Sequence, residues 1–225
     1  MVAATLAIRR AQAGDDTLLI DLAGDQPDLL GVSTPEHGVG DWLSGTDIPL
    51  DGLTALEREV APHLRLLVRG TAPTLERLDV LAGVCAASGR TVVVDAGVAS
   101  DAHWAAGHAE EVVVLRACCL AARRAGTLGP RTRLVVIEEP GRALRASDVA
   151  DAVGVPVWCR LIADPAVGRS VDAGLLTVRR LAPARAGPSH RRIRPRHLGG
   201  GRACAARHRL GSQHVGCRRS DGCRS

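Results

Sequence analysis

The sequence contains no lysine, no phenylalanine and no tyrosine. All 29 basic residues are arginines, and the aromatic residues are three tryptophans. Chemistry that needs an amine side chain, such as Schiff-base formation, is therefore excluded. The sequence also lacks an apolar run of about 18 residues and a basic start followed by an apolar block, so neither a membrane-spanning helix nor a secretory signal is predicted. The seven cysteines are odd in number and predict no disulfide framework. We expect a cytoplasmic protein.

Charge divides the chain into two unequal parts near Pro183. Residues 1–182 carry 18 arginines and 23 acidic residues, whereas residues 183–225 carry 11 arginines and the single acid Asp221. The first part has the apolar content of a globular domain. The second part has almost no apolar residues and no periodicity, so it cannot build a core. We therefore predict an α/β domain over residues 1–182 and a basic, disordered tail over residues 183–225.

Short apolar runs recur through the first part at the length of strands, and helical patterns lie between them. Their apolar content is nearly continuous, as in strands that are buried on both faces of a parallel sheet. The predicted strands are 17–22, 64–68, 91–95, 111–116, 133–137 and 155–161, and the predicted helices are 74–88, 117–128 and 147–153. This alternation predicts an α/β fold with a mostly parallel sheet and helices on both faces. Residues 23–63 form a Gly- and Pro-rich excursion with a brief helical pattern at 53–60.

Four stretches resemble the MinD/ParA family of P-loop ATPases, and in particular its CpaE-like branch. The most specific stretch comprises residues 133–141 and 148–176, and it keeps a Gly-x-Pro strand entry, the helix start Asp164–Pro165 and then Gly174 in the order of the family. The other three are residues 2–32, 64–70 and 91–97, which resemble the helix and strand after the P-loop, the next strand, and the Walker-B strand. The resemblance implies a P-loop NTPase-like fold, with ATP and Mg²⁺ as cofactors.

The resemblance assigns candidate cofactor-binding roles to Asp21, Asp95 and Gly97. Asp95 matches the Walker-B aspartate, which would hold Mg²⁺ through a water molecule, so it is the candidate metal ligand. Each aspartate has an alternative role in any α/β protein: Asp95 could cap the next turn, and Asp21 could end its strand at the Gly24–Asp25 turn. We assign no catalytic residue.

The sequence also departs from this family at the positions that carry its chemistry. A P-loop needs glycines, a lysine and a Ser/Thr hydroxyl to bind phosphates and magnesium, and Met1 already stands at the start of the helix that should follow it. Ala23 stands in place of the switch I aspartate, and Glu138 in place of the base-reading asparagine. We therefore expect an N-terminally incomplete relative that does not hydrolyse ATP.

A missing P-loop implies a missing central strand before it. By the strand order of the family, the vacancy should lie between residues 91–95 and 133–137, leaving backbone groups of both strands unpaired. We expect such a chain to be poorly soluble or to depend on a partner strand.

Two other sets of residues contain metal-binding side chains but lack the spacing of a metal site. His103 and His108 are five residues apart, which does not place them on one helical face. In the tail, Cys204, His208 and Cys217 belong to a spacing that matches no zinc finger. The tail could bind polyanions unspecifically through its arginines. The favoured interpretation is that the tail is GC-rich coding sequence read in a shifted frame, which its composition resembles.

The resemblance implies an ATPase whose ATP-dependent dimerisation positions septum, chromosome or pilus machinery. It therefore suggests a homodimer, a protein partner in division, partitioning or pilus assembly, and possible peripheral association with a membrane. The alternative is a non-catalytic α/β interaction module that binds a protein partner without nucleotide.

Overall fold

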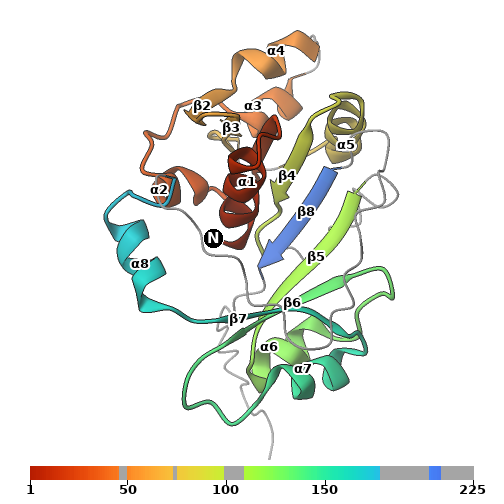
Figure 1. Ribbon diagram of the computed structural model, residues 1–225. Helices are drawn as coiled ribbons and strands as arrows, with labels where there is room; N and C mark the ends of the chain where they lie inside the picture. The colour runs from red at the N-terminus through yellow and green to blue at the C-terminus, as the bar shows by residue number, and fades with distance from the viewer. Residues whose placement is uncertain (46–49, 73–74, 99–108, 178–202, 209–225) are drawn as a thin grey trace, which may run out of the picture.

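The predicted apolar runs pair into one mostly parallel sheet. The computed structural model describes residues 1–45, 50–72, 75–98, 109–177 and 203–208 (Figure 1). Within them, eight strands pair in the order β2-β3-β1-β4-β8-β5-β6-β7, and the β2–β3 pair alone is antiparallel. The strands are β1 (Thr17–Asp21), β2 (Arg58–Ala61), β3 (Leu64–Leu67), β4 (Thr91–Asp95), β5 (Ala109–Arg116), β6 (Arg133–Glu138), β7 (Val157–Ile162) and β8 (Ala203–His208). All six predicted strands are confirmed.

The helices begin and end at residues that local backbone chemistry favours. Gly89 and Gly154, which follow α5 and α7, have φ of 69° and 76°, the left-handed conformation in which glycine ends a helix without strain. Asp164 opens α8, and its Oδ1 accepts a hydrogen bond of 2.8 Å from the Ala166 amide. The helices are α1 (Val2–Gln12), α2 (Gln26–Leu30), α3 (Val39–Ser44), α4 (Leu50–Ala55), α5 (Leu78–Ala87), α6 (Cys119–Ala125), α7 (Ala146–Val153) and α8 (Pro165–Asp172). The three predicted helices are confirmed.

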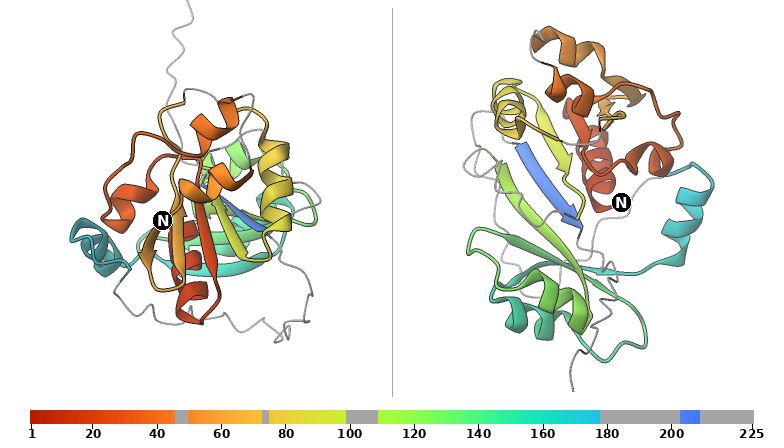
Figure 2. Two further views of the ribbon diagram at one scale, coloured as in Figure 1. Left: turned by 90° about the horizontal axis from the view of Figure 1, so that it is seen from above. Right: turned by 180° about the vertical axis from the view of Figure 1, so that it is seen from behind.

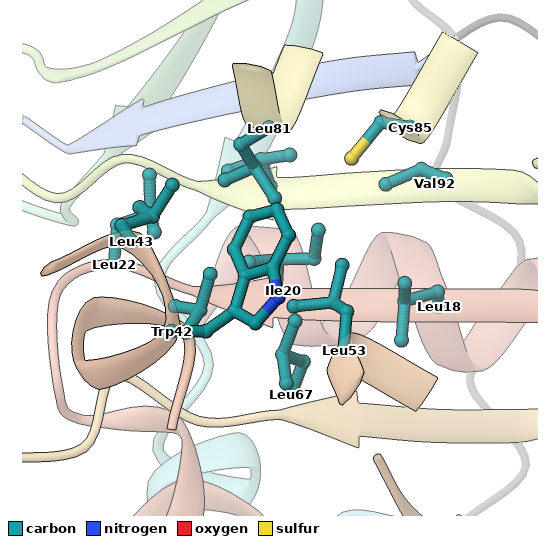
Figure 3. Close-up of a cluster of buried hydrophobic side chains, with 12 residues drawn as sticks. Leu18, Ile20, Leu22, Trp42, Leu43, Leu53, Leu67, Leu81, Cys85 and Val92 are labelled. Carbon is teal, nitrogen blue, oxygen red and sulfur yellow. The ribbon is translucent and has the colours of Figure 1, made fainter. Parts of the chain in front are cut away.

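Alternate residues of β1 and β4 point into two different hydrophobic clusters, so both faces of this part of the sheet are covered. Leu18 and Ile20 pack with Trp42 of α3 and with residues of α4 and α5 (Figure 3). Leu19, between them in the sequence, packs against the alanine-rich face of α1 on the opposite side. The helices α6 and α7 cover one face of β5 and β6. This is the layer arrangement predicted from the continuous apolar runs.

The excursion after β1 is more structured than the sequence predicted. It contains α2, α3 and α4, followed by β2. The helical prediction for residues 53–60 is wrong in its second half, because Arg58–Ala61 form the antiparallel strand β2 beside β3. Arg58 and Glu59 are exposed on this edge strand, so the strand leaves no apolar pattern that could have distinguished it from a helix.

The largest departure from the sequence-based prediction is β8. Residues 203–208 were assigned to a disordered tail, but they form a strand that pairs in parallel with β4 on one side and β5 on the other. Front and back views both show β8 between these strands (Figures 1 and 2). The prediction that residues 133–137 border the central position is therefore wrong, because they belong to β6, one strand further out. The domain boundary at 182 remains a prediction, as does the disorder of 183–202 and 209–225, which lie outside the described residues.

Candidate functional site at the carboxyl ends of β1 and β4

Two aspartates end neighbouring parallel strands at the same register position. Asp21 of β1 pairs with Asp95 of β4, and the two residues are 0% and 1% exposed. The carboxyl ends of adjacent parallel strands form the usual ligand-binding edge of an open α/β sheet. The structure thus brings together the two carboxylates that the sequence singled out, and Gly97 lies two residues beyond the second.

Asp21 is engaged by the backbone of the turn that follows it. Its Oδ1 accepts hydrogen bonds from the amides of Ala23 at 3.0 Å and Gly24 at 2.7 Å, and its Oδ2 accepts one from the amide of Gln26 at 3.0 Å. These bonds hold the turn between β1 and α2. The alternative role suggested for Asp21, a strand end that organises the Gly24–Asp25 turn, therefore has direct geometric support.

Asp95 is engaged at both carboxylate oxygens. Its Oδ1 accepts a hydrogen bond of 3.0 Å from the Gly97 amide, and its Oδ2 accepts one of 2.6 Å from the side-chain amide of Gln26. The same Gln26 nitrogen donates to Asp25 at 3.0 Å. Gln26 is fully buried, and its Oε1 has no hydrogen-bond partner among the described residues. Asp95 therefore both caps its following turn and binds the loop after β1.

Gly97 lies where the loop after β4 packs against Ala23 of the loop after β1. Its φ is 65°, and a Cβ added there would lie 3.1 Å from the Cβ of Ala23. A residue with a side chain would be strained by the backbone angle and crowded by Ala23. Gly97 thus permits the packing of the loop after β4 against the loop after β1.

Burial sets the protonation behaviour of both aspartates. Desolvation raises the pKa of Asp21 above its ordinary value, and the hydrogen bonds from the amides of Gly24 and Gln26 only partly oppose this. Desolvation also raises the pKa of Asp95, against the opposing effects of the Gly97 amide and the α-amino group of Met1.

Sequence reasoning missed Gln26, the residue that joins the two strand ends. A glutamine five positions beyond a strand-end aspartate carries no recognisable signal. Its importance comes from burial against Asp95, which lies 69 residues away. Only the pairing of β1 with β4 brings these residues together.

Glu138 ends β6 in an ion pair with the next strand. Its carboxylate accepts hydrogen bonds from the guanidinium of Arg160, the shortest at 2.8 Å, and from the Ala146 amide at 2.9 Å. Burial raises the pKa of Glu138, but these hydrogen bonds outweigh that effect and hold the pKa below its usual value. These hydrogen bonds connect the end of β6 to the start of α7 and to Arg160 within β7.

The described residues support no metal site built from the other histidines and cysteines considered in the sequence. No group of three or more His, Cys, Asp or Glu side chains within the described ranges is arranged to hold a metal ion. His103, His108 and Cys217 lie outside the described residues. Over the described part of the chain, no helix is both long enough and apolar enough to cross a bilayer.

Comparison with solved structures identifies the fold. A ParA family ATPase from Chlorobium tepidum TLS superposes with a TM-score of 0.62 at 20% identity, covering 79% of this chain and 84% of that one. The septum site-determining protein MinD complexed with Mg-ADP from Pyrococcus horikoshii OT3 gives 0.58 at 16% identity, covering 79% and 81%. The MinD cell division protein of Aquifex aeolicus gives 0.55 at 16% identity, covering 77% and 79%. The chain has the ParA/MinD fold.

Sequence comparison adds relatives of unassigned function. No family model matches the sequence. Two uncharacterized proteins of Mycobacterium tuberculosis, MT3760 of strain CDC 1551 / Oshkosh and Rv3660c of strain ATCC 25618 / H37Rv, are each 29% identical over 79% of this chain. The chain spans 56% of the length of each of these relatives.

The residues at the candidate site of this ParA/MinD fold do not fit magnesium and a nucleoside triphosphate. Mg²⁺ needs carboxylate oxygens that can face the ion or its waters, and a protein donor already occupies one lone pair of each Asp95 oxygen. Both oxygens of Asp21 are likewise engaged by backbone amides. The sequence also contains no lysine to neutralise the phosphates. All these donors to the two aspartates belong to the loops after β1 and β4 and to the start of α2, so these hydrogen bonds hold the two strand ends together.

Proposed function

We propose that this chain is a relative of the MinD/ParA/CpaE-type positioning ATPases that, in this form, does not bind Mg²⁺ and ATP and does not run the ATP-dependent dimerisation cycle. The observation that carries the proposal is the 2.6 Å hydrogen bond from Gln26 to Asp95. It places a neutral protein donor at the carboxylate that the resemblance assigns to magnesium. The missing lysine supports the same conclusion, because phosphoryl transfer depends on the neutralisation of phosphate charge.

The cellular role follows from the likeness to ParA and MinD. We propose that the chain acts in the cytoplasm, or at the membrane surface, through contact with a protein of the division, partitioning or pilus-assembly machinery. A homodimer belongs to the same proposal. The names of the solved neighbours, a septum site-determining protein and a cell division protein among them, support a positioning role.

Nucleotide binding by the full chain tests the proposal. Calorimetric titration with Mg-ATP and with Mg-ADP should give no binding tighter than about 1 mM, the affinity that corresponds to about −4.1 kcal/mol. The variant Gln26→Ala removes the donor from Asp95 and should still fail to bind, because no lysine is present. Binding in the micromolar range that needs magnesium and is lost in Asp95→Asn would overturn the proposal.

A second candidate function is an interaction module with no nucleotide role in any form of the protein. One observation favours it: β7 is an edge strand with no partner on its outer side among the described residues, and Ile162 at its end is 71% exposed. Open strand edges can bind extended segments of a partner. The genomic sequence before the codon for Met1 separates the two candidates. An in-frame glycine-rich loop there would favour the ATPase relative, whereas a stop codon would favour the module.

A further inference from the structure

The centre of the sheet is closed by β8, the last of the described strands in chain order. β4 and β5 do not pair with each other, and β8 pairs in parallel with both. The register places Cys204 opposite Val93 of β4 and Glu110 of β5. The helices α1 and α5 lie alongside β8. Removal of β8 would therefore leave a space that has the length and direction of one parallel strand.

The neighbours of this space are valine-rich, whereas its occupant is not. β4 contributes Val92–Val94 and β5 contributes Val112–Val114, and all six residues are at most 2% exposed. Strands buried within parallel sheets are typically rich in β-branched residues. The sequence of β8 is Ala-Cys-Ala-Ala-Arg-His, and alanine is depleted in strands because it offers little side chain to pack. β8 thus meets the backbone requirement of the position but lacks its usual side chains.

β8 is also connected to the rest of the described chain by a long segment. The 25 residues 178–202 separate it from the preceding described residue, Thr177. At about 3.3–3.6 Å per extended residue, a connection of this length can span on the order of 80 Å. The connection is therefore long enough for β8 to leave the sheet when another strand takes its place.

We propose that the space between β4 and β5 is a strand-acceptor site in which β8 is a replaceable occupant. The partner that fits is an extended polypeptide segment of about six residues that is rich in β-branched side chains and runs parallel to β4. The same mode of recognition, in which main-chain hydrogen bonds give affinity and side chains give specificity, occurs wherever a donated strand completes a sheet. The inference does not depend on whether the chain binds nucleotide.

A reversible lock on β8 tests the proposal in the full chain. In the variant Glu110→Cys, the new cysteine is the register partner of Cys204. Neighbouring strands lie about 4.7–4.9 Å apart, which is within the Cα separation that a disulfide allows. The probe is a fluorescein-labelled peptide that copies residues 89–96. Its control carries proline in place of Val93 and so lacks a ladder donor. The matched control protein is Glu111→Cys, which stands opposite Ala205.

Oxidation of Glu110→Cys should form a disulfide between positions 110 and 204, which peptide mapping identifies. The disulfide keeps β8 in the sheet and so removes the population that can bind the probe. Binding of the probe should therefore be weaker by about tenfold or more than in the reduced protein. Oxidation of Glu111→Cys should leave binding unchanged, and the proline peptide should not bind. The proposal is overturned if the disulfide does not form in folded protein, if binding is equal with and without it, or if the reduced protein does not bind the probe. If Glu110→Cys fails to fold, Ala205→Pro serves instead. Proline removes a ladder donor from β8, so the probe should bind about tenfold more tightly to this variant than to the wild type. Unchanged binding of the probe would overturn the proposal.

Discussion

The side-chain amide of Gln26 and the carboxylate of Asp95 are joined by a hydrogen bond of 2.6 Å inside the protein, across 69 residues of sequence. The bond connects the first residue of α2 with the last residue of β4. Because both residues are essentially inaccessible to water, a water molecule cannot take the place of either hydrogen-bond partner. The loops that follow β1 and β4 are therefore held as one unit.

Replacement of Gln26 by methionine should destabilise the protein by about 1–3 kcal/mol. The change removes the donor to a buried carboxylate oxygen while nearly preserving side-chain volume, and an unsatisfied buried polar group costs about that much. Urea unfolding monitored by circular dichroism measures the effect. Gln12→Met makes the same chemical change at an exposed position of α1 and should have the smaller effect, because water can replace any partner that an exposed group loses. Equal effects at the two positions would show that the hydrogen bond to Asp95 adds no stability.

The raised pKa of Asp95 predicts how stability depends on pH. A group whose pKa is higher in the folded than in the unfolded state favours the folded state in acid, and this contribution is lost as pH rises through the folded pKa. The ordinary pKa of the group is 3.8. The stability of the wild type relative to Asp95→Asn should therefore increase as pH is lowered from 7 toward 4. Unfolding titrations of both proteins across this range check the sign, and a decrease would contradict the prediction.

Gly97→Ala should destabilise the protein more than Gly89→Ala. Both glycines have positive φ, 65° and 69°, but an added Cβ meets Ala23 at 3.1 Å at position 97 and meets nothing within 4 Å at position 89. Both substitutions carry a backbone strain of about 1 kcal/mol from the positive φ. The difference between their losses of unfolding free energy therefore measures the crowding of the added Cβ against Ala23. Thermal unfolding of the two variants measures it. A smaller loss at position 97 would show that Ala23 yields without strain.

The parts of the fold that were predictable from sequence are those set by local pattern. The run 91–95 is continuous in its apolar residues and ends in aspartate, so both the strand and its polar terminus could be predicted. Gly154 likewise predicted the end of α7, and the resemblance to the family placed a helix start at Asp164–Pro165, where α8 begins. In each case the determining interactions lie within a few residues of the chain.

The parts that were not predictable depend on partners far away in the sequence. Gln26 is a functional element only because β1 pairs with β4. β8 contains too little apolar surface to be recognised as a strand, and its conformation is set by backbone hydrogen bonds to two valine-rich neighbours. Arg58–Ala61 became a strand through pairing with β3. Tertiary context determines secondary structure at such positions.

A pair of truncations should show whether β8 stabilises the sheet. A chain that ends at Arg202 lacks β8, and a chain that ends at Arg209 keeps it. The shorter chain should lose cooperative unfolding, because several unpaired backbone groups at about 1–3 kcal/mol each rival the net stability of a domain, about 5–15 kcal/mol. The longer chain should unfold as the full protein does. Differential scanning calorimetry compares them, and similar transitions in both would show that the sheet is complete without residues 203–208.

The position of β8 also bears on the order in which the protein can fold during synthesis. β1, β3 and β4 can pair once residue 95 has left the ribosome, and β5, β6 and β7 can pair after residue 162. The junction between these two groups, however, requires residues 203–208. Contacts so distant in sequence form slowly, because a long loop must close before they are made. Until residues 203–208 have been synthesised, both halves of the sheet thus present an unpaired valine-rich strand to the cell. In this interval, aggregation or capture by a chaperone competes with folding.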